Sequence, residues 1–97
     1  VSGVMAFDPA LEDATKAALT GLAAATAKEE GCVEYNYWAS LEEPGVYRVF
    51  EQWESEEAIH GHMSSPHMAE FLGSVGDLGV TRAEIWRYDV SDTSKLM

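Results

Sequence analysis

The sequence predicts an α+β domain of the ferredoxin-like type, with the element order strand, helix, strand, strand, helix, strand. Three observations lead to this prediction. A short apolar run is followed by an alanine-rich amphipathic segment, two segments rich in β-forming residues flank a turn at 42–45, and a second helical segment precedes an aromatic-rich strand. This βαββαβ order is typical of a four-stranded antiparallel sheet that carries two helices on one face.

The first strand is expected at 4–7, because the apolar run there ends at Asp8-Pro9. Asp8 can cap a helix whose first residue is Pro9, and Gly31 is the expected stop signal after that helix. Apolar residues at spacings of three and four give the helix one inward face. This face comprises Leu11, Ala14, Ala18, Leu19, Leu22 and Ala25.

The next two strands, 33–39 and 46–53, are rich in β-branched and aromatic residues and should form an antiparallel hairpin. Alternation places Val33, Tyr35, Tyr37 and Ala39 on one face of the first of them and Trp38 on the other. Aromatic residues on both faces indicate that the sheet face without helices is also buried. A second copy of the chain is the simplest cover, so we expect a homodimer.

The stretch 50–71 runs from a strand into a broken helix and contains all three histidines. Ser55 is a good helix N-cap, and Ser65-Pro66 repeats the signal, so a second helical piece should start there at an angle. The resulting bend should separate His62 and His67 and work against a shared metal site. A loop at 73–81, a last strand at 82–90 and a polar tail at 91–97 follow, which makes 1–90 a single domain.

The composition narrows the choice of partners. Seventeen acidic and six basic residues give a net charge of −11, which disfavours nucleic acid and anionic membranes as partners. A single cysteine, Cys32, excludes an internal disulfide and is expected to be a buried structural thiol. The chain shows neither a signal peptide nor a membrane-length apolar run, so a cytoplasmic location is expected.

Three motifs support a resemblance to a known family. They are Glu29-Glu30-Gly31-Cys32, Glu51-Gln52-Trp53-Glu54-Ser55 and His62-Met63-Ser64-Ser65-Pro66-His67-Met68. Together they resemble the antibiotic biosynthesis monooxygenase family, and within it most nearly the bacterial quinol monooxygenases. The resemblance covers about 7–90 and implies a dimeric α+β barrel with a pocket between sheet and helices in each subunit.

The resemblance also implies site residues. Trp53, His62 and His67 match the helix-side motif of the family and are the expected catalytic residues. The expected substrate-binding residues are the apolar and aromatic side chains around them: Tyr35, Tyr37, Phe50, Met63 and Phe71. Haem-degrading relatives use an asparagine on the first strand, and that strand has none here, so haem degradation is disfavoured. An upstream asparagine used by the polyketide oxygenases is likewise missing, with Val49 in the equivalent region.

The implied activity is a cofactor-independent monooxygenation of a small aromatic quinol or polyphenol by dioxygen, with His62 as the base. No Gly-rich phosphate loop, dinucleotide fingerprint or zinc-protease motif occurs, so no cofactor and no metal are expected. His60 should be a solvated surface residue, whereas His62 is either a hydrogen-bonded packing residue or a pocket base. The same features fit two alternatives: a non-catalytic dimeric module that binds a small ligand, and an isomerase of a sugar-derived ketone.

Overall fold

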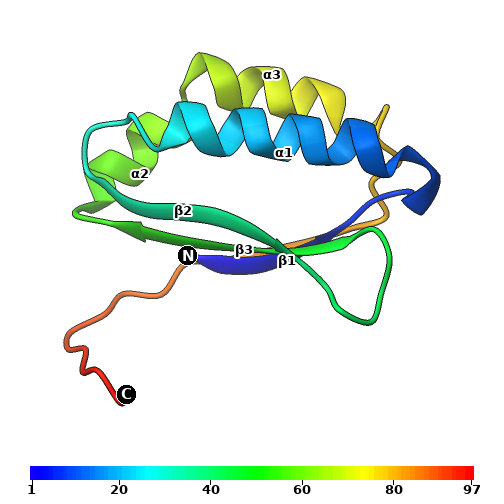
Figure 1. Ribbon diagram of the computed structural model, residues 1–97. Helices are drawn as coiled ribbons and strands as arrows, with labels where there is room; N and C mark the ends of the chain where they lie inside the picture. The colour runs from blue at the N-terminus through cyan, green and yellow to red at the C-terminus, as the bar shows by residue number, and fades with distance from the viewer.

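The computed structural model describes all 97 residues and shows the expected ferredoxin-like order of elements (Figure 1). The last helical region is divided in two, as the Ser65-Pro66 signal predicts. The strands are β1 (Ser2–Ala6), β2 (Cys32–Ala39), β3 (Val46–Trp53) and β4 (Arg82–Trp86), and the helices are α1 (Glu12–Thr26), α2 (Glu56–Met63) and α3 (Pro66–Ser74), with a short 3-10 turn, η1 (Pro9–Leu11), before α1.

The four strands form one antiparallel sheet in the order β2-β3-β1-β4. Helices α1 and α3 lie side by side over one face, and α2 lies at the end of that layer (Figure 1). The core fills the space between this layer and the sheet. Its buried apolar residues are Met5, Phe7, Leu19, Leu22, Tyr35, Tyr47, Val49, Met68, Phe71 and Leu78.

The start of the first helix follows the sequence signal only in part. Asp8 caps it as predicted, because its carboxylate accepts a hydrogen bond from the Ala10 N–H at 2.9 Å. The first turn is a 3-10 turn, however, and its tighter winding changes which residues face the sheet. The prediction is therefore wrong for Leu11 and Ala14, which are exposed, while Thr15 takes an inward position.

Strand β2 contains an irregularity that the alternation pattern did not reveal. Its pairing with β3 shifts between Cys32 and Glu34, so Val33 does not share the inward face of Tyr35 and is more than half exposed. A bulge of this kind leaves one residue out of the two-residue repeat. Beyond it the prediction holds, since Tyr35 and Tyr37 both face the helix layer and are packed in or against the core.

The last strand is shorter than predicted. Strand β4 ends at Trp86, where it pairs with Ser2, the first residue of β1, so the residues after Trp86 have no strand partner. The prediction of a strand to 90 is therefore wrong. From Arg87 onward the chain leaves the sheet without further helix or strand and runs to the C-terminus away from the helix layer (Figure 1).

The sheet face opposite the helices is uncovered in the single chain. Phe50 and Trp86 both pair with Ser2 in the sheet, so they lie on this face together with Trp38 of the edge strand. Their exposed fractions are 42% for Phe50, 65% for Trp86 and 59% for Trp38. Three large aromatic side chains are thus left in contact with solvent on one surface.

Candidate functional site

A cluster of polar and aromatic side chains lies between the end of the sheet and the broken helix. Strands β2 and β3 contribute Tyr35 and Trp53, α2 contributes His62, and α3 contributes His67. The fifth member, Glu29, lies in the loop between α1 and β2. Five separate elements therefore meet at one place.

The break between α2 and α3 orients the two histidines. The Ser65 hydroxyl donates to the carbonyl oxygen of His62 at 2.6 Å and accepts from the N–H of Met68 at 3.3 Å. Ser65 thus caps α3 and holds it against the end of α2, as its position before Pro66 predicts. The bend brings the imidazole rings of His62 and His67 to a centroid distance of 6.0 Å.

Glu29 connects the two histidines. Its Oε2 atom lies 2.6 Å from Nδ1 of His62 and 2.8 Å from Nε2 of His67. Because a carboxylate oxygen only accepts, both ring nitrogens donate to it. The expectation that the bend would separate the histidines from a common partner is therefore wrong: the bend turns them toward the same oxygen atom.

Sequence reasoning missed Glu29 as a site residue. It lies in the motif 29–32 that supports the family resemblance, yet nothing in that motif indicates that a loop glutamate faces a helix 33 positions later. The sequence marks Gly31 only as a stop signal, whereas the structure shows what this glycine does for the loop. Its φ of +83° and its close approach to Ala58 of α2 place the loop directly against the histidine-bearing helix.

Burial differs among the three members of this Glu29–His62–His67 cluster. The side chain of His62 is 2% exposed, that of Glu29 15% and that of His67 24%. Nε2 of His62 has no hydrogen-bond partner, yet it keeps some contact with solvent. In the neutral ring with its proton on Nδ1, this nitrogen carries the free lone pair.

Aromatic rings enclose the His62 imidazole. Tyr35 and Trp53 pack on it with ring centroids at 5.2 and 5.0 Å. The Tyr35 hydroxyl lies 3.1 Å from that of Tyr37. Burial holds the pKa of Tyr35 far above its ordinary value and raises the pKa of Tyr37 to about 12, so both phenols keep their protons near neutral pH.

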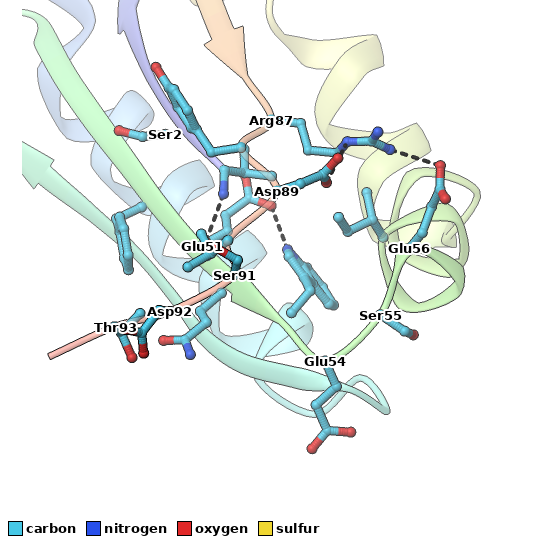
Figure 2. A pocket seen from close by; sticks show the side chains of 17 residues that line it. Ser2, Glu51, Glu54, Ser55, Glu56, Arg87, Asp89, Ser91, Asp92 and Thr93 are labelled. Carbon is cyan, nitrogen blue, oxygen red and sulfur yellow. Dashed lines mark hydrogen bonds and ion pairs between the residues drawn. The ribbon is translucent and has the colours of Figure 1, made fainter.

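A hollow of about 870 Å³ lies next to this cluster, and His62 is not among its lining residues. Figure 2 shows the side chains that line it. Trp53 belongs to both: its ring contacts His62, and it lines the hollow together with the buried Glu51, to which its indole N–H donates at 2.9 Å. The C-terminal segment from Arg87 to Thr93 forms another wall. In Figure 2, Arg87 reaches Glu56 of α2, at 2.8 Å.

The other predicted site residues lie elsewhere. Phe50 points to the uncovered face of the sheet, since it alternates with the inward-facing Val49 and Glu51, and it lines the hollow of about 870 Å³ without reaching the cluster. Met63 is more than half exposed at the end of α2, and Phe71 is a core residue. His60 is exposed, as predicted, beside Glu56. Of the eight predicted residues, the cluster thus brings together Trp53, His62, His67, Tyr35 and, through its hydroxyl, Tyr37.

A profile of the family described as "Antibiotic biosynthesis monooxygenase" matches residues 1–73. The chain belongs to this family. The match includes every residue of the cluster and ends in α3, so β4 and the C-terminal segment lie outside the matched part. The resemblance noted from the three motifs is thereby confirmed at the level of the family.

Two curated proteins show the same relationship. An uncharacterized protein of Synechocystis sp. is 31% identical over 68 residues, which is 70% of this chain and 46% of that protein. Rv0793 of Mycobacterium tuberculosis, named as a candidate monooxygenase, is 31% identical over 70 residues, which is 72% of this chain and 68% of that protein. The alignment with the Synechocystis relative thus spans about half of the length of that protein.

Solved structures of the family share the fold. A structure from Deinococcus radiodurans, described as a candidate antibiotic biosynthesis monooxygenase, superposes with a TM-score of 0.93 at 25% identity and covers 99% of this chain and 95% of its own. The structure of Rv0793 superposes with a TM-score of 0.79 at 24% identity over 94% of this chain and 95% of its own. The second likeness shows the fold alone.

The single cysteine contributes little to the chemistry of this family member. Cys32 is only partly buried, contrary to the expectation of a buried thiol. This partial burial, with smaller contributions from the carboxylates of Glu29 and Glu51, raises the pKa of its thiol and makes it a poor nucleophile. The imidazole and carboxylate groups of the cluster are therefore the main reactive groups of the helix-side face.

In a separate respect, every helix of the chain is too short or too polar to cross a membrane.

Proposed function

We propose that the protein is a cofactor-independent monooxygenase that oxidises a small aromatic quinol or polyphenol with dioxygen. The single observation that carries the proposal is the pair formed by Glu29 and His62: a buried imidazole whose Nδ1–H is held by a carboxylate and whose Nε2 is free. Membership of the antibiotic biosynthesis monooxygenase family supports chemistry of the monooxygenase type. The substrate class and the role of His62 are our inference.

His62 acts as the general base in this proposal. Its Nε2 takes the phenolic proton, and Glu29 stabilises the imidazolium that results and keeps the ring in the tautomer that can accept at Nε2. General-base catalysis of this kind contributes about 100- to 10,000-fold. Glu29 also accepts a hydrogen bond from the more exposed His67, which connects the buried base to solvent.

The quinol anion supplies the electrons. It passes one electron to dioxygen, which gives a semiquinone and superoxide, and these radicals combine at a ring carbon to form a hydroperoxide. Loss of water then leaves a hydroxyquinone, so that one quinol and one dioxygen give one hydroxyquinone and one water. Both oxygen atoms and all four electrons are accounted for without an external reductant, and the protein removes the first proton and holds the anion.

The substrate ring would bind in the hollow of about 870 Å³, whose size suits a molecule of one or two rings. Trp53 offers a stacking surface there. Because the indole of Trp53 lies against His62, we expect it to turn when substrate binds, so that Nε2 can reach the phenol. The hydroxyls of Tyr35 and Tyr37 are bonded to each other and do not line this hollow, so they would serve as donors to an oxyanion only where the same movement exposes them.

Oxygen consumption with menadiol tests this proposal. We expect the wild-type protein to consume oxygen and His62→Ala to lose at least about 100-fold of that rate, the lower limit for a general base. His60→Ala, which removes an exposed histidine two positions earlier, is the matched control and should be unaffected. Wild-type protein without quinol-dependent uptake contradicts the function, and a fully active His62→Ala removes His62 from the mechanism.

One observation favours a second candidate, the non-catalytic dimeric module. Rings of Tyr35, Trp53 and His67 fill most of the space around His62, which leaves it 2% exposed, and a packed cluster needs no reaction to explain it. Such a module would bind an aromatic ligand without consuming oxygen. The isomerase of a sugar-derived ketone would also leave menadiol unoxidised, and it stays a prediction. The cytoplasmic location likewise stays a prediction.

The proposed partner on the uncovered sheet face is a second copy of the chain. Trp38, Phe50 and Trp86 give this face an apolar surface that a monomer would leave in water. A chain of 97 residues buries only about 60–70% of its unfolded surface on folding alone, so association adds needed apolar burial. The same face of an identical chain is complementary in chemistry and gives a closed two-fold dimer.

A further inference from the structure

We propose that Glu29, His62 and His67 also form a binding site for a divalent transition-metal ion of the zinc type. The cluster offers three donors, Oε2 of Glu29, Nδ1 of His62 and Nε2 of His67, which all lie within 4.8 Å of one another. Two imidazoles and one carboxylate are the protein ligands of many zinc sites that keep an open coordination position. The inference goes beyond the proposed oxygenation, which needs no metal.

The geometry requires the three donors to shift: the two histidine nitrogens, which lie within 4.8 Å of each other, would approach to about 3.4 Å, and the carboxylate would withdraw. Ligand atoms about 2.1 Å from a tetrahedral zinc ion lie about 3.4 Å apart. The present distances of 2.6 and 2.8 Å from Glu29 Oε2 to the two nitrogens are those of hydrogen bonds, so the carboxylate would withdraw by less than about 1 Å. Glu29 is on a loop and has a flexible side chain, which makes it the ligand best able to move.

The two histidines are held in place by their surroundings. Tyr35 and Trp53 pack against the His62 ring, and Ser65 joins the end of α2 to the start of α3 through bonds to His62 and Met68. Rings fixed in this way lose little freedom when they bind an ion, so the site is largely preorganised.

The surface beside the cluster favours the approach of a cation. A hollow of about 460 Å³ borders Glu29 and is also lined by Glu30, Glu54 and Glu57. Four carboxylates around one hollow, on a chain with a net charge of −11, concentrate cations there. Glu29 and His67 are both partly exposed, so an ion can reach the donors without unfolding of the helices.

Metal binding and base catalysis would exclude each other. The ion occupies Nδ1 of His62 and Nε2 of His67 in place of their protons, and each neutral ring then carries its proton on the other nitrogen. His62 with a proton on Nε2 cannot accept one from a phenol. This consequence rests on the proposed function, whereas the binding of the ion does not.

The test is a titration of chelator-treated protein with Co²⁺, followed by its visible absorption, and then displacement by Zn²⁺. We expect one saturable site per chain. Glu29→Ala and His67→Ala should each weaken binding about a hundredfold or more, beyond the 10–100-fold effect typical of residues that only support ligands. His60→Ala is the control, since it removes a surface imidazole that also has a glutamate neighbour, Glu56.

A second measurement reads the mechanism directly. Nitrogen-15 NMR of the histidine rings should show the His62 proton on Nδ1 without metal and on Nε2 with Zn²⁺. Absence of saturable binding, binding that survives loss of Glu29 and His67, or binding lost with His60 overturns the proposal. Failure of oxygen uptake with intact Co²⁺ binding overturns the proposed function alone, and the reverse result overturns the metal site alone.

Discussion

Glu29 Oε2 lies 2.6 Å from His62 Nδ1 although the two residues are 33 positions apart and belong to a loop and a helix. The pair is the shortest polar contact between the α1–β2 loop and α2, and its carboxylate also accepts from His67. Removal of either partner leaves a buried donor or acceptor without its bond, so the pair contributes to stability as well as to any chemistry.

The first prediction concerns this contact. Glu29→Ala should lower the free energy of unfolding by about 1–3 kcal/mol, because the buried Nδ1–H of His62 loses its acceptor. Urea unfolding followed by tryptophan fluorescence measures the change. Glu30→Ala, which removes an exposed neighbouring carboxylate, is the control and should stay within about 0.5 kcal/mol of the wild type. Equal stability of the two variants would contradict a structural role for the contact.

The second prediction concerns the loop that carries Glu29. Gly31 has a φ of +83°, and a Cβ atom there would lie 2.6 Å from the Cβ of Ala58, so Gly31→Ala should destabilise the fold by about 1–3 kcal/mol. Gly21→Ala is the matched control. No heavy atom lies within 4 Å of a Cβ at this position in α1, so alanine should stabilise the helix by about 0.5–1 kcal/mol.

Opposite signs for the two glycine variants in thermal unfolding would confirm that the loop position is constrained by backbone conformation and close contact. A neutral Gly31→Ala would show that the loop can move away from α2. Oxygen uptake by Gly31→Ala would then report whether Glu29 still reaches His62.

The third prediction is a pH dependence. Burial raises the pKa of Tyr37 to about 12, above the value of about 10 for an unfolded tyrosine. Between these two values the folded state keeps the proton that the unfolded state has lost. The stabilisation is therefore complete below pH 10 and declines as the pH rises toward 12, by at most about 1.4 kcal/mol per pH unit for this group.

Absorbance at the tyrosinate band after a rapid pH jump measures this titration. The difference between wild type and Tyr37→Phe isolates the single hydroxyl and should have its midpoint near 12. A midpoint near 10 would show that the hydroxyl pair of Tyr35 and Tyr37 is open to water, contrary to the structure.

The fourth prediction concerns the uncovered sheet face. Trp86→Glu and Trp38→Glu should shift the protein from dimer to monomer in sedimentation velocity, because each places a charge in the proposed apolar interface. Leu41→Glu adds the same charge at a fully exposed position between β2 and β3 and should leave the mass unchanged. A wild-type protein that sediments as a monomer would refute the proposed partner.

The order of elements could be predicted because each has a local signal. Asp8 before Pro9, Ser55 before two glutamates and Ser65 before Pro66 mark helix starts through bonds that depend on neighbouring residues alone. The ends of β4 and the bulge in β2 have no such signal. They depend on which residue of another strand is available for pairing, and that is a property of the assembled sheet.

The site was predicted less completely for the same reason. His62, His67 and Trp53 could be found because they share one stretch of sequence and one family motif. Glu29 could not, because its role depends on the path of a loop relative to a distant helix. Met63 was placed in the lining by residue type, whereas the phase of the helix directs it outward; Phe50 points to the uncovered face and lines the neighbouring hollow, not the cluster.

The Ser65-Pro66 break has a consequence for how this sequence could vary. In one continuous helix, positions five apart point about 140° away from each other, so the rings of His62 and His67 could not both bond to the Glu29 carboxylate. A variant in which α2 and α3 fused would have a more regular helix but would lose the proposed chemistry. The Ser65-Pro66 break therefore allows an arrangement that a regular helix excludes, and its loss should abolish the proposed chemistry before it unfolds the protein.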